Sequence, residues 1–368
     1  MPKRLRALGL MSGTSMDGID VALVETDGED FVRRGPSRTY SYDAGQRARL
    51  AHSLSEAKPL TDRFARPGSL AELEKQLTAW HAQAVQSFYE DTGFDRAEID
   101  IIGFHGHTIL HRPCDRLTVQ LGDGGLLARL TGLSVVNDFR AADVAAGGEG
   151  APFVPVYHQA LAAVIPARPL IFVNIGGVAN ITFIGRNGAL IAFDKGPGNA
   201  LIDDWVLAHT GSPADYGGRY ALSGHVDEEM LNRLMDDSYF TVRPPKSLDR
   251  QRFSIGRIAG MSLEDGAATL TLFTARSIAA AVNHLPDSPK AWIICGGGRR
   301  NPALMGALEN AVQEGIVMPA EAQGLNGDAL EAEAFAYLAV RSLHGLPLSF
   351  PSTTRVPVPM PGGVHHTA

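Results

Sequence analysis

Glycine clusters that follow apolar stretches are the feature that most constrains how this chain can fold. The chain has 40 glycines, and many of them come directly after a short apolar run rich in β-branched residues. Glycine admits positive φ and close approach to the backbone, so α/β proteins use such loops to bring backbone amides against a ligand. One or two of these loops could be plain turns, but eight clusters favour a large polar or anionic ligand. The clusters are Gly9 to Gly18, Gly103 to Gly106, Gly122 to Gly125, Gly147 to Gly150, Gly176 and Gly177, Gly196 and Gly198, Gly217 and Gly218, and Gly296 to Gly298.

Apolar periodicity predicts strands that alternate with helices, which indicates an α/β fold. Strands are expected at 5–10, 19–25, 99–102, 117–121, 134–136, 170–175, 181–184, 190–193 and 291–294. Helices are expected from Ser69, with a capping box to Glu72, at 199–209, at 264–285, from Pro302, and at 330–343. The tail from Pro347 is expected to be irregular. The segments 5–25 and 170–184 are both predicted to form a strand, a loop and a second strand. This likeness can come from a duplication, or by chance, because similar hairpins are common in α/β proteins.

Length, charge and cysteine content exclude several classes of protein. A chain of 368 residues can bury a core without disulfides and is long enough for two domains. Its formal net charge of -7 argues against a general nucleic-acid binder, which needs cations to neutralise phosphates. The two cysteines, Cys114 and Cys295, exclude a disulfide framework and a four-cysteine zinc site. No apolar run reaches the roughly 18 residues of a membrane span, and the N-terminal residues lack the apolar region of a signal peptide, so we expect a cytoplasmic protein.

The common nucleotide and hydrolase motifs do not occur in the sequence. The chain has neither GxxxxGK[ST] nor a GxGxxG between a strand and a helix, and neither HExxH nor GxSxG. His105 and His107 form an H-x-H pair after an expected strand, a spacing that supplies metal ligands in some barrel hydrolases. A zinc site would need further ligands at other strand ends. We therefore expect His105 to orient a substrate hydroxyl and His107 to be incidental.

Carboxylates set in the glycine loops are the strongest candidates for chemistry. A carboxylate beside a Gly/Ser/Thr loop can order magnesium and phosphate oxygens, which is most of what phosphoryl transfer needs. In an enclosed loop it can also act as a general base. Each one alone could instead be a loop cap, but together with two glycine hairpins they favour a kinase or an ATPase. These residues are Asp17, Asp20, Asp123, Asp138, Asp143 and Asp194.

Ten segments, in this order, resemble the anhydro-N-acetylmuramic acid kinases. They are GLMSGTSMDGID (9–20), HGHTILHRP (105–113), QLGDG (120–124), DFRAADVAAGGEGAP (138–152), NIGGVANIT (174–182), FDKGPGNALID (193–203), PPKSLDR (244–250), CGGGRRNPALM (295–305), EAEAFA (331–336) and FPSTT (350–354). That family belongs to the acetate and sugar kinase, Hsp70 and actin superfamily. The resemblance therefore implies two duplicated actin-like (ribonuclease H-like) α/β lobes with an ATP and substrate cleft between them. We expect an N-terminal lobe at 1–150 and a C-terminal lobe at 151–368.

The resemblance also implies an activity. The family uses ATP and water to convert 1,6-anhydro-N-acetylmuramic acid into N-acetylmuramic acid 6-phosphate and ADP, a phosphotransfer to an alcohol group in peptidoglycan recycling. The expected ligands are ATP, Mg²⁺ and a small sugar, with no nucleic acid and no membrane, and a homodimer is left open. The alternatives are another sugar or carboxylate kinase of the superfamily, a nucleotide-dependent chaperone or filament protein, and a degenerate binder without catalysis.

The resemblance further implies a role for individual residues. Asp194 matches the catalytic aspartate, Glu331 matches a second acidic residue of the site, and Asp17 would order Mg²⁺. The sugar side of the cleft would contain His105, Asp138, Arg140 and Asp143. The ATP contacts would be Gly13, Thr14, Ser15, Met16, Asp17, Gly18, Ile19, Asp20, Gly176, Gly177, Gly296, Gly297, Gly298 and Asn301.

Four residues depart from the usual pattern of that family. Lys195 stands where FDTGPGN has Thr, and Arg355 stands where Gly is usual. His107 and Glu149 stand where HGQT and GGQGAP have Gln. Lys195 has the largest expected consequence, because a cation beside Asp194 would weaken that carboxylate as a base.

Overall fold

The structure is a computed structural model that describes residues 3–13, 15–248 and 252–368. The chain folds into two units, and the second is inserted within the first. Unit 1 comprises residues 1–163 and 329–368, and unit 2 comprises residues 164–328. The structure thus divides the chain differently from the expected boundary at 150, because its last long helix packs on strands of the N-terminal unit.

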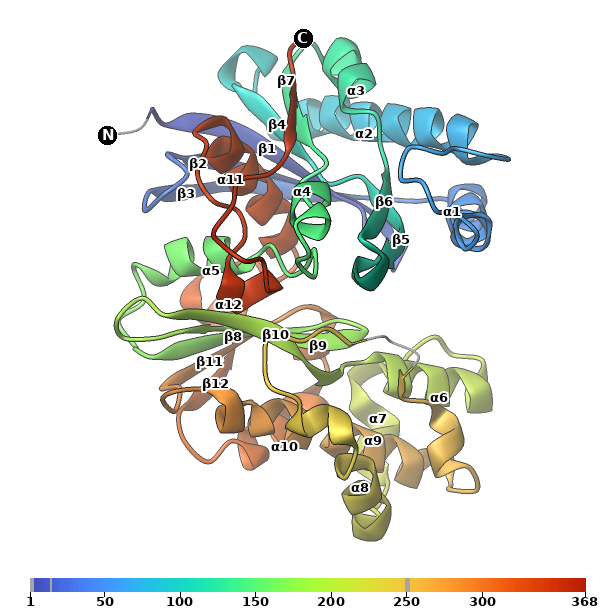
Figure 1. Cartoon of the computed structure of the whole chain (residues 1–368). Helices are drawn as coiled ribbons and strands as arrows, with labels where there is room; N and C mark the ends of the chain where they lie inside the picture. Colours follow the sequence, from blue (N-terminus) through green and yellow to red (C-terminus); the bar gives the residue numbers. More distant parts are fainter. Residues whose placement is uncertain (1–2, 14, 249–251) are drawn as a thin grey trace. The chain divides into compact units, whose positions relative to one another are not determined.

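Unit 1 contains a six-stranded mixed sheet in the order β13-β7-β4-β1-β2-β3 (Figure 1). The first three strands form an antiparallel meander, β4 and β7 then run parallel to β1, and β13 pairs antiparallel with β7. A separate two-stranded hairpin is formed by β5 and β6. The strands are β1 (Leu5–Met11), β2 (Gly18–Thr26), β3 (Val32–Ser41), β4 (Ile101–Phe104), β5 (His107–Arg112), β6 (Leu117–Leu121), β7 (Ser134–Asn137) and β13 (Val364–His366).

Helices cover this sheet, and the alternation of side chains along β1 shows how. Leu8 and Leu10 join the core cluster that includes Leu73 and Leu77 of α2. A Cβ at Gly9 between them would lie 1.7 Å from the carbonyl oxygen of Ala332, so glycine is needed here for α11 to lie directly on the strand. The helices of unit 1 are α1 (Ala44–Ala57), α2 (Leu70–Thr92), α3 (Gly124–Thr131), α4 (Ala141–Ala145), α5 (Pro155–Ala162), α11 (Leu330–Leu343) and α12 (Pro351–Thr354).

Unit 2 contains a five-stranded sheet in the order β10-β9-β8-β11-β12. Helix α9 packs against β10 and against the other four helices of the unit. The strands are β8 (Leu170–Ile175), β9 (Val178–Ile184), β10 (Leu190–Pro197), β11 (Ala291–Cys295) and β12 (Ile316–Pro319). The helices are α6 (Ala200–Thr210), α7 (Arg219–Ser223), α8 (Glu228–Met235), α9 (Leu263–Ala279) and α10 (Pro302–Ala311).

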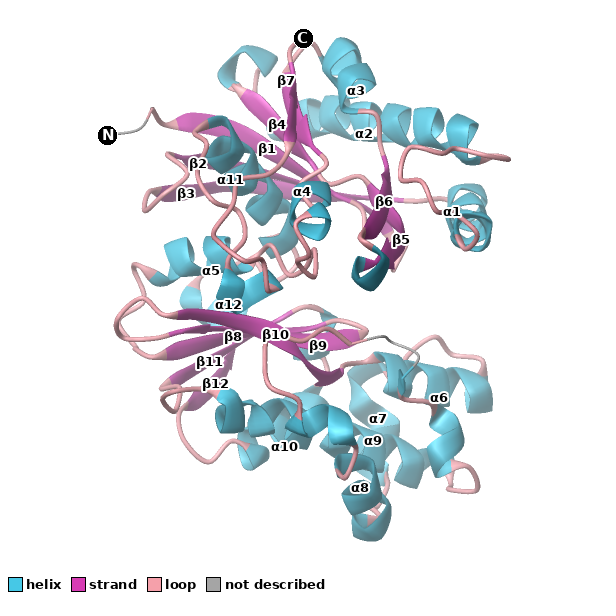
Figure 2. Ribbon diagram, viewed as in Figure 1, coloured by secondary structure: helices cyan, strands magenta, loops and turns pink. Residues whose placement is uncertain are grey.

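The two sheets share one topology, which confirms the expected duplication. In unit 2, β8, β9 and β10 form an antiparallel meander, and β11 and β12 run parallel to β8. This repeats the order and directions of β1, β2, β3, β4 and β7 in unit 1, and Figure 2 shows the strands of each unit with helices beside them. Each unit is therefore one ribonuclease H-like lobe.

Local predictions were wrong at three places. Ser69 precedes α2 but makes no side-chain cap, because its hydroxyl donates to the carboxylate of Glu56 instead. Helix α9 ends at Ala279 and continues as a 3₁₀ helix over Ala280–His284. The C-terminal tail contains α12 and the strand β13, which closes one edge of the unit 1 sheet.

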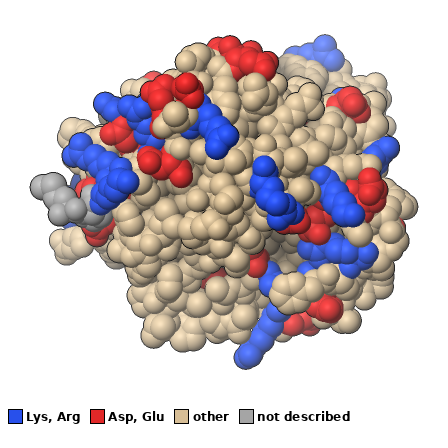
Figure 3. All heavy atoms as spheres, turned by 90° about the horizontal axis from the view of Figure 1, so that it is seen from above, with Lys and Arg blue, Asp and Glu red and all other residues tan. Residues whose placement is uncertain are grey.

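Two general features of the protein are the distribution of charge on its surface and the character of its helices. On the face seen in Figure 3, acidic and basic side chains intermingle. No helix in the described part of the chain combines the length and the apolar character that crossing a bilayer requires.

Candidate functional site

The loop between β1 and β2 has its own hydrogen bonds and presents polar groups to solvent. The Ser15 hydroxyl donates to the Asp17 carboxylate at 2.7 Å, and both residues are exposed. The backbone N–H of Met16 donates to the Gly13 carbonyl at 3.1 Å, with Met16 in the left-handed region at φ 54°. Thr14, also expected to contact ATP, lies outside the described residues. The loop thus offers backbone amides and one solvent-facing carboxylate.

The last three residues of the predicted ATP segment belong to β2 and have structural roles. The side chain of Ile19 is 2% exposed and lies in the core. A Cβ at Gly18 would lie 2.6 Å from the carbonyl oxygen of Tyr40 on the neighbouring strand. Asp20 accepts a hydrogen bond from the Thr39 hydroxyl at 2.5 Å. Among the described residues of this segment, Gly13 and 15–17 are therefore the part that is open to a ligand.

A magnesium site made by the protein alone is not present in the described residues, where no three His, Cys, Asp or Glu side chains are grouped to hold a metal. Mg²⁺ keeps several waters and is usually held by one or two carboxylates plus the phosphates of its substrate. The exposed carboxylate of Asp17 fits that second kind of site.

Three of the four predicted sugar-site residues lie together in unit 1, around Arg140. Arg140 donates from Nε and Nη2 to Nε2 of His105, each at 3.1 Å, and from Nη1 to the Gly150 carbonyl at 2.7 Å. The Asp143 carboxylate accepts from the Gly150 N–H at 2.7 Å and from the Thr354 hydroxyl at 2.6 Å. The cluster therefore ties β4, α4 and α12 to one loop.

Both ring nitrogens of His105 are engaged by protein atoms. Nδ1 lies 2.9 Å from the Gly106 carbonyl, which can only accept, so Nδ1 carries the proton and Nε2 accepts from Arg140. Burial and the Arg140 cation hold the pKa of His105 well below its ordinary value. His105 thus acts on Arg140, whereas we had expected it to face a substrate hydroxyl.

The other two predicted residues of unit 1, Glu331 and Asp138, interact with two different arginines. Glu331 lies in the first turn of α11, and together with Asp143 it opposes the effect of burial, which lowers the pKa of Arg140 to about 10. Asp138 is in the left-handed region at φ 56° and forms an ion pair with Arg63. Glu331 therefore joins the Arg140 cluster electrostatically, and Asp138 pairs with a different arginine.

In unit 2, Asp194 sits at a β-bulge in β10 and is held at three atoms. The strand register shifts between Asp194 and Gly196. The Asp194 N–H donates to the Lys246 carbonyl at 2.9 Å, its own carbonyl accepts from the Tyr239 hydroxyl at 2.5 Å, and its carboxylate accepts from the Leu248 N–H at 2.8 Å. Bulges often re-aim a side chain beside an active site, and this one is fixed by the loop that carries PPKSLDR. Asp249 and Arg250 of that motif lie outside the described residues.

Among the described residues, Lys246 interacts electrostatically with Asp194, which is the role that we expected for Lys195. Burial lowers the pKa of Lys246 to about 8, and the Asp194 carboxylate opposes that fall. The Lys195 side chain is 1% exposed, and its ammonium lies 5.3 Å from the centre of the Phe240 ring. Burial and the nearby Lys246 lower the pKa of Lys195 to about 8. Lys195 is next to Asp194 in the sequence, but its side chain is buried in the interior of unit 2. Its position in the sequence therefore does not show which groups it contacts.

Three glycine turns of unit 2 lie close together at the ends of β8, β10 and β11, and two of them are hydrogen-bonded to each other. The N–H groups of Gly198 and Asn199 donate to the carbonyls of Gly177 and Gly176 at 2.9 and 2.7 Å. A Cβ at Gly298 would lie 2.4 Å from the Ile175 side chain. Asn301 caps α10 by accepting from the Leu304 N–H at 3.2 Å. The structure thus brings together the predicted glycines of unit 2, which are Gly176, Gly177, Gly296, Gly297 and Gly298. Asn301 has a structural role beside them.

Some of these glycines have no packing reason to be glycine. A Cβ at Gly13, Gly176, Gly177 or Gly297 would come no closer than 3.5 Å to any other described atom, and none has φ in the left-handed region. Glycine in such places lets a ligand approach the backbone closely. All four are among the predicted ATP contacts, in the loop of unit 1 and in two turns of unit 2.

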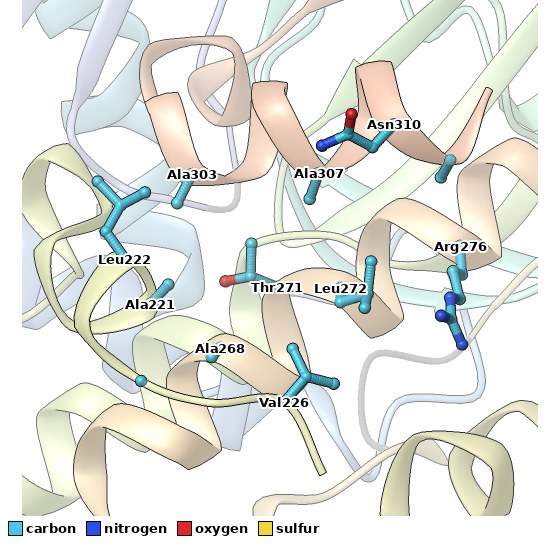
Figure 4. A pocket seen from close by; sticks show the side chains of 12 residues that line it. Ala221, Leu222, Val226, Ala268, Thr271, Leu272, Arg276, Ala303, Ala307 and Asn310 are labelled. Carbon is cyan, nitrogen blue, oxygen red and sulfur yellow. The ribbon is translucent and has the colours of Figure 1, made fainter. Parts of the chain in front are cut away.

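A groove of about 400 Å³ lies between α7, α9 and α10 of unit 2 (Figure 4). Alanine is the most frequent residue of its walls, which also include Leu222 on α7, Thr271 on α9 and Asn310 on α10. None of the predicted site residues lines it. The groove therefore does not mark the predicted site.

Sequence reasoning missed several residues that hold the site. Lys246 lies in a segment quoted for the resemblance but was given no role, and Tyr239 and Asn199 were not singled out. Tyr42 has no local motif, although its N–H donates to the Asp17 carbonyl at 3.0 Å. Contacts made across strands or between loops leave no pattern in a single sequence.

Comparison with known proteins gives a consistent family. A model described as anhydro-N-acetylmuramic acid kinase matches residues 5–364. Proteins of that name from Paramagnetospirillum magneticum and Agrobacterium fabrum are 52% and 51% identical, each over 363 residues. The alignments cover 98% of this chain and 99% of the first relative, and 97% of this chain and 97% of the second.

Among solved structures, component A of (R)-2-hydroxyglutaryl-CoA dehydratase from Acidaminococcus fermentans has a TM-score of 0.50 and 11% identity, and the alignment covers 92% of this chain and 99% of that one. That likeness concerns the fold alone and agrees with the two actin-like lobes. The match of sequence over nearly the whole length decides the family. The chain belongs to the anhydro-N-acetylmuramic acid kinase family.

Proposed function

We propose that the protein is an ATP-dependent kinase that converts 1,6-anhydro-N-acetylmuramic acid and water into N-acetylmuramic acid 6-phosphate and ADP. The observation that carries this proposal is 52% identity over 98% of the chain to a relative of that name. Because the reaction consumes ATP and serves peptidoglycan recycling, we place it in the cytoplasm.

The open glycines support a role in binding ATP. Backbone N–H groups presented by glycine turns are good donors to phosphate oxygens, and no Cβ blocks their approach. We assign the phosphates of ATP to residues 13–17 of unit 1 and to the turns at Gly176–Gly177 and Gly297 of unit 2. Asp17 would hold Mg²⁺, whose positive charge offsets the charge that develops on the phosphates during transfer.

Asp194 is suited to take a proton from water. Opening the intramolecular acetal requires water to attack C1 while O6 leaves, and O6 is captured by the γ-phosphoryl group of ATP. No separate acid is then needed at O6. The Leu248 N–H donates to the Asp194 carboxylate and fixes its orientation. A carboxylate held in this way can accept a proton from a water within hydrogen-bond reach.

The Arg140 cluster is suited to hold the sugar side of the reaction. Glu331 provides an acidic group at the first turn of α11, and Arg140 lies where it interacts with that charge. His105 and Asp143 fix the position of Arg140 and of the loop that follows it. We infer that Glu331 is the second acidic residue of the site and that His105 acts through Arg140.

Mass analysis of the product tests this function directly. The purified protein with ATP, Mg²⁺ and the anhydro sugar should give a product heavier than the sugar by one water and one HPO₃. A product heavier by HPO₃ alone would mean an ordinary sugar kinase. Binding of ATP and sugar without any product would mean a degenerate binder.

A further inference from the structure

Tyr42, just after β3, is bonded to both ends of the loop between β1 and β2. Its backbone N–H donates to the Asp17 carbonyl at 3.0 Å, and its hydroxyl donates to the hydroxyl of Ser12 at 2.9 Å. Ser12 precedes the loop directly and is 1% exposed, and Tyr42 is 3% exposed. One residue therefore bridges the two ends of the segment, next to the point where β1 and β2 stop pairing.

The hydrogen-bonded chain continues from Ser12 to His107. The Ser12 hydroxyl lies 3.1 Å from Nδ1 of His107. A hydroxyl has one proton and two lone pairs, so Ser12 can accept from Tyr42 and also bond to Nδ1 of His107. Burial lowers the pKa of His107 to about 4, so the ring is neutral at physiological pH.

His81 of α2 is a second buried histidine that interacts with His107. Its Nδ1 lies 2.8 Å from the Leu77 carbonyl, which can only accept, so Nε2 of His81 carries a lone pair. Nε2 of His81 and Nε2 of His107 are both buried with no partner among the described residues, and the two rings interact electrostatically.

We propose that Tyr42, Ser12 and His107 are positioning residues that hold the loop 13–17 in the shape that binds the phosphates of ATP. The proposal rests on the proposed function. Loss of a buried hydrogen bond leaves its partner unsatisfied and the loop end free to move, and small displacements of positioned groups cost large factors in rate. His107, which we had expected to be incidental, is thus tied through Ser12 to the residues that meet the nucleotide.

Tyr42→Phe tests the proposal, because it removes one hydroxyl and keeps the ring that packs on Trp80 with ring centres 5.8 Å apart. We expect the dissociation constant of a non-hydrolysable ATP analogue, measured by calorimetry, to rise about tenfold. The kcat/KM for ATP should fall by a similar factor, while the KM for the sugar stays at the wild-type value. Tyr40→Phe is the matched control. Tyr40 lies two residues earlier, within β3, and the variant also loses one hydrogen bond, but this bond is to Asp91 at 2.9 Å and not to Ser12.

A second pair of variants keeps the test valid if Tyr42→Phe does not fold. Gln at position 107 can still accept from Ser12, so His107→Gln should retain the affinity for the analogue, and His107→Leu should lose about tenfold. Equal affinities in Tyr42→Phe, Tyr40→Phe and wild type would overturn the positioning role. A wild-type protein that does not bind the analogue would instead overturn the proposed function itself.

Discussion

At the scale of single residues, Asp194 is the group on which the proposed chemistry depends most. Asn at this position can still accept from the Leu248 N–H, so the loop should stay in place. We expect Asp194→Asn to keep the affinities for ATP and sugar and to lose roughly 10²–10⁴-fold in turnover, the range for a general base. Steady-state kinetics and calorimetry measure the two effects. An active Asp194→Asn enzyme would move the role to another residue, with Glu331 the next candidate.

A second prediction for a single residue concerns Asp17, which is the exposed carboxylate of the first loop and would hold Mg²⁺. An amide lacks the charge that a magnesium ion requires, so Asp17→Asn should raise the Mg²⁺ concentration needed for half-maximal activity. The far-UV circular dichroism and the melting temperature should stay at wild-type values. If the variant melts much earlier at unchanged Mg²⁺ demand, then Asp17 is a loop cap and not a metal ligand.

Lys195 allows a pH prediction with a definite sign. Its pKa is about 8 in the folded protein against 10.5 ordinarily, so between these values the unfolded chain binds more protons. The penalty for the buried charge is thus complete below pH 8, and the free energy of unfolding rises with pH from about 8 to 10.5. Lys195→Met should raise the free energy of unfolding at pH 7 by about 2 kcal/mol and flatten that rise.

Urea unfolding at several pH values checks this prediction. Lys290→Met is the control, because Lys290 is exposed and pairs only loosely with Glu314 at 3.6 Å. A Lys195→Met variant that is less stable than wild type at pH 7 would show that the ammonium has a favourable role in the folded protein.

At the scale of elements, the strands that consist of a buried apolar run could be predicted from the sequence, and a polar edge strand could not. β1 and β8 were predicted because nearly every residue in them is buried. β3 was missed because it is an edge strand with the polar sequence VRRGPSRTYS and no buried residue. The capping box at Ser69 failed for a related reason, since a carboxylate distant in sequence competes for the hydroxyl.

Two departures from the family pattern turn out to be neighbours in the loops after α4 and α12. Arg355 lies 3.3 Å from Glu149, and its φ of 65° is one that favours glycine. We expect the substitutions Glu149→Gln and Arg355→Gly to be non-additive, with a coupling of about 0.5 kcal/mol in the free energy of unfolding, since the Arg355 side chain is half exposed. A double-mutant cycle in urea, at low and at high salt, measures it. Strict additivity at low salt would mean that the pair contributes nothing.

At the scale of the whole molecule, the duplicated lobe could be predicted and its boundary could not. The hairpins at the start of each half are local in sequence, so their likeness was visible. The return of α11 to the first sheet depends on contacts with Gly9 and Gly103, far away in the chain. In the same way, the interaction of Asp194 with Lys246 joins residues that are far apart in the chain, so the sequence alone does not show it.

The route of water through the reaction tests the central claim most directly. The enzyme is supplied with ATP, Mg²⁺ and 1,6-anhydro-N-acetylmuramic acid in water enriched with heavy oxygen, and the product is fragmented in a mass spectrometer. If water attacks C1 and O6 takes the phosphoryl group, the label is found at C1 of the sugar and not in the phosphate. Label in the phosphate, or an unlabelled sugar that still carries phosphate, would contradict the account.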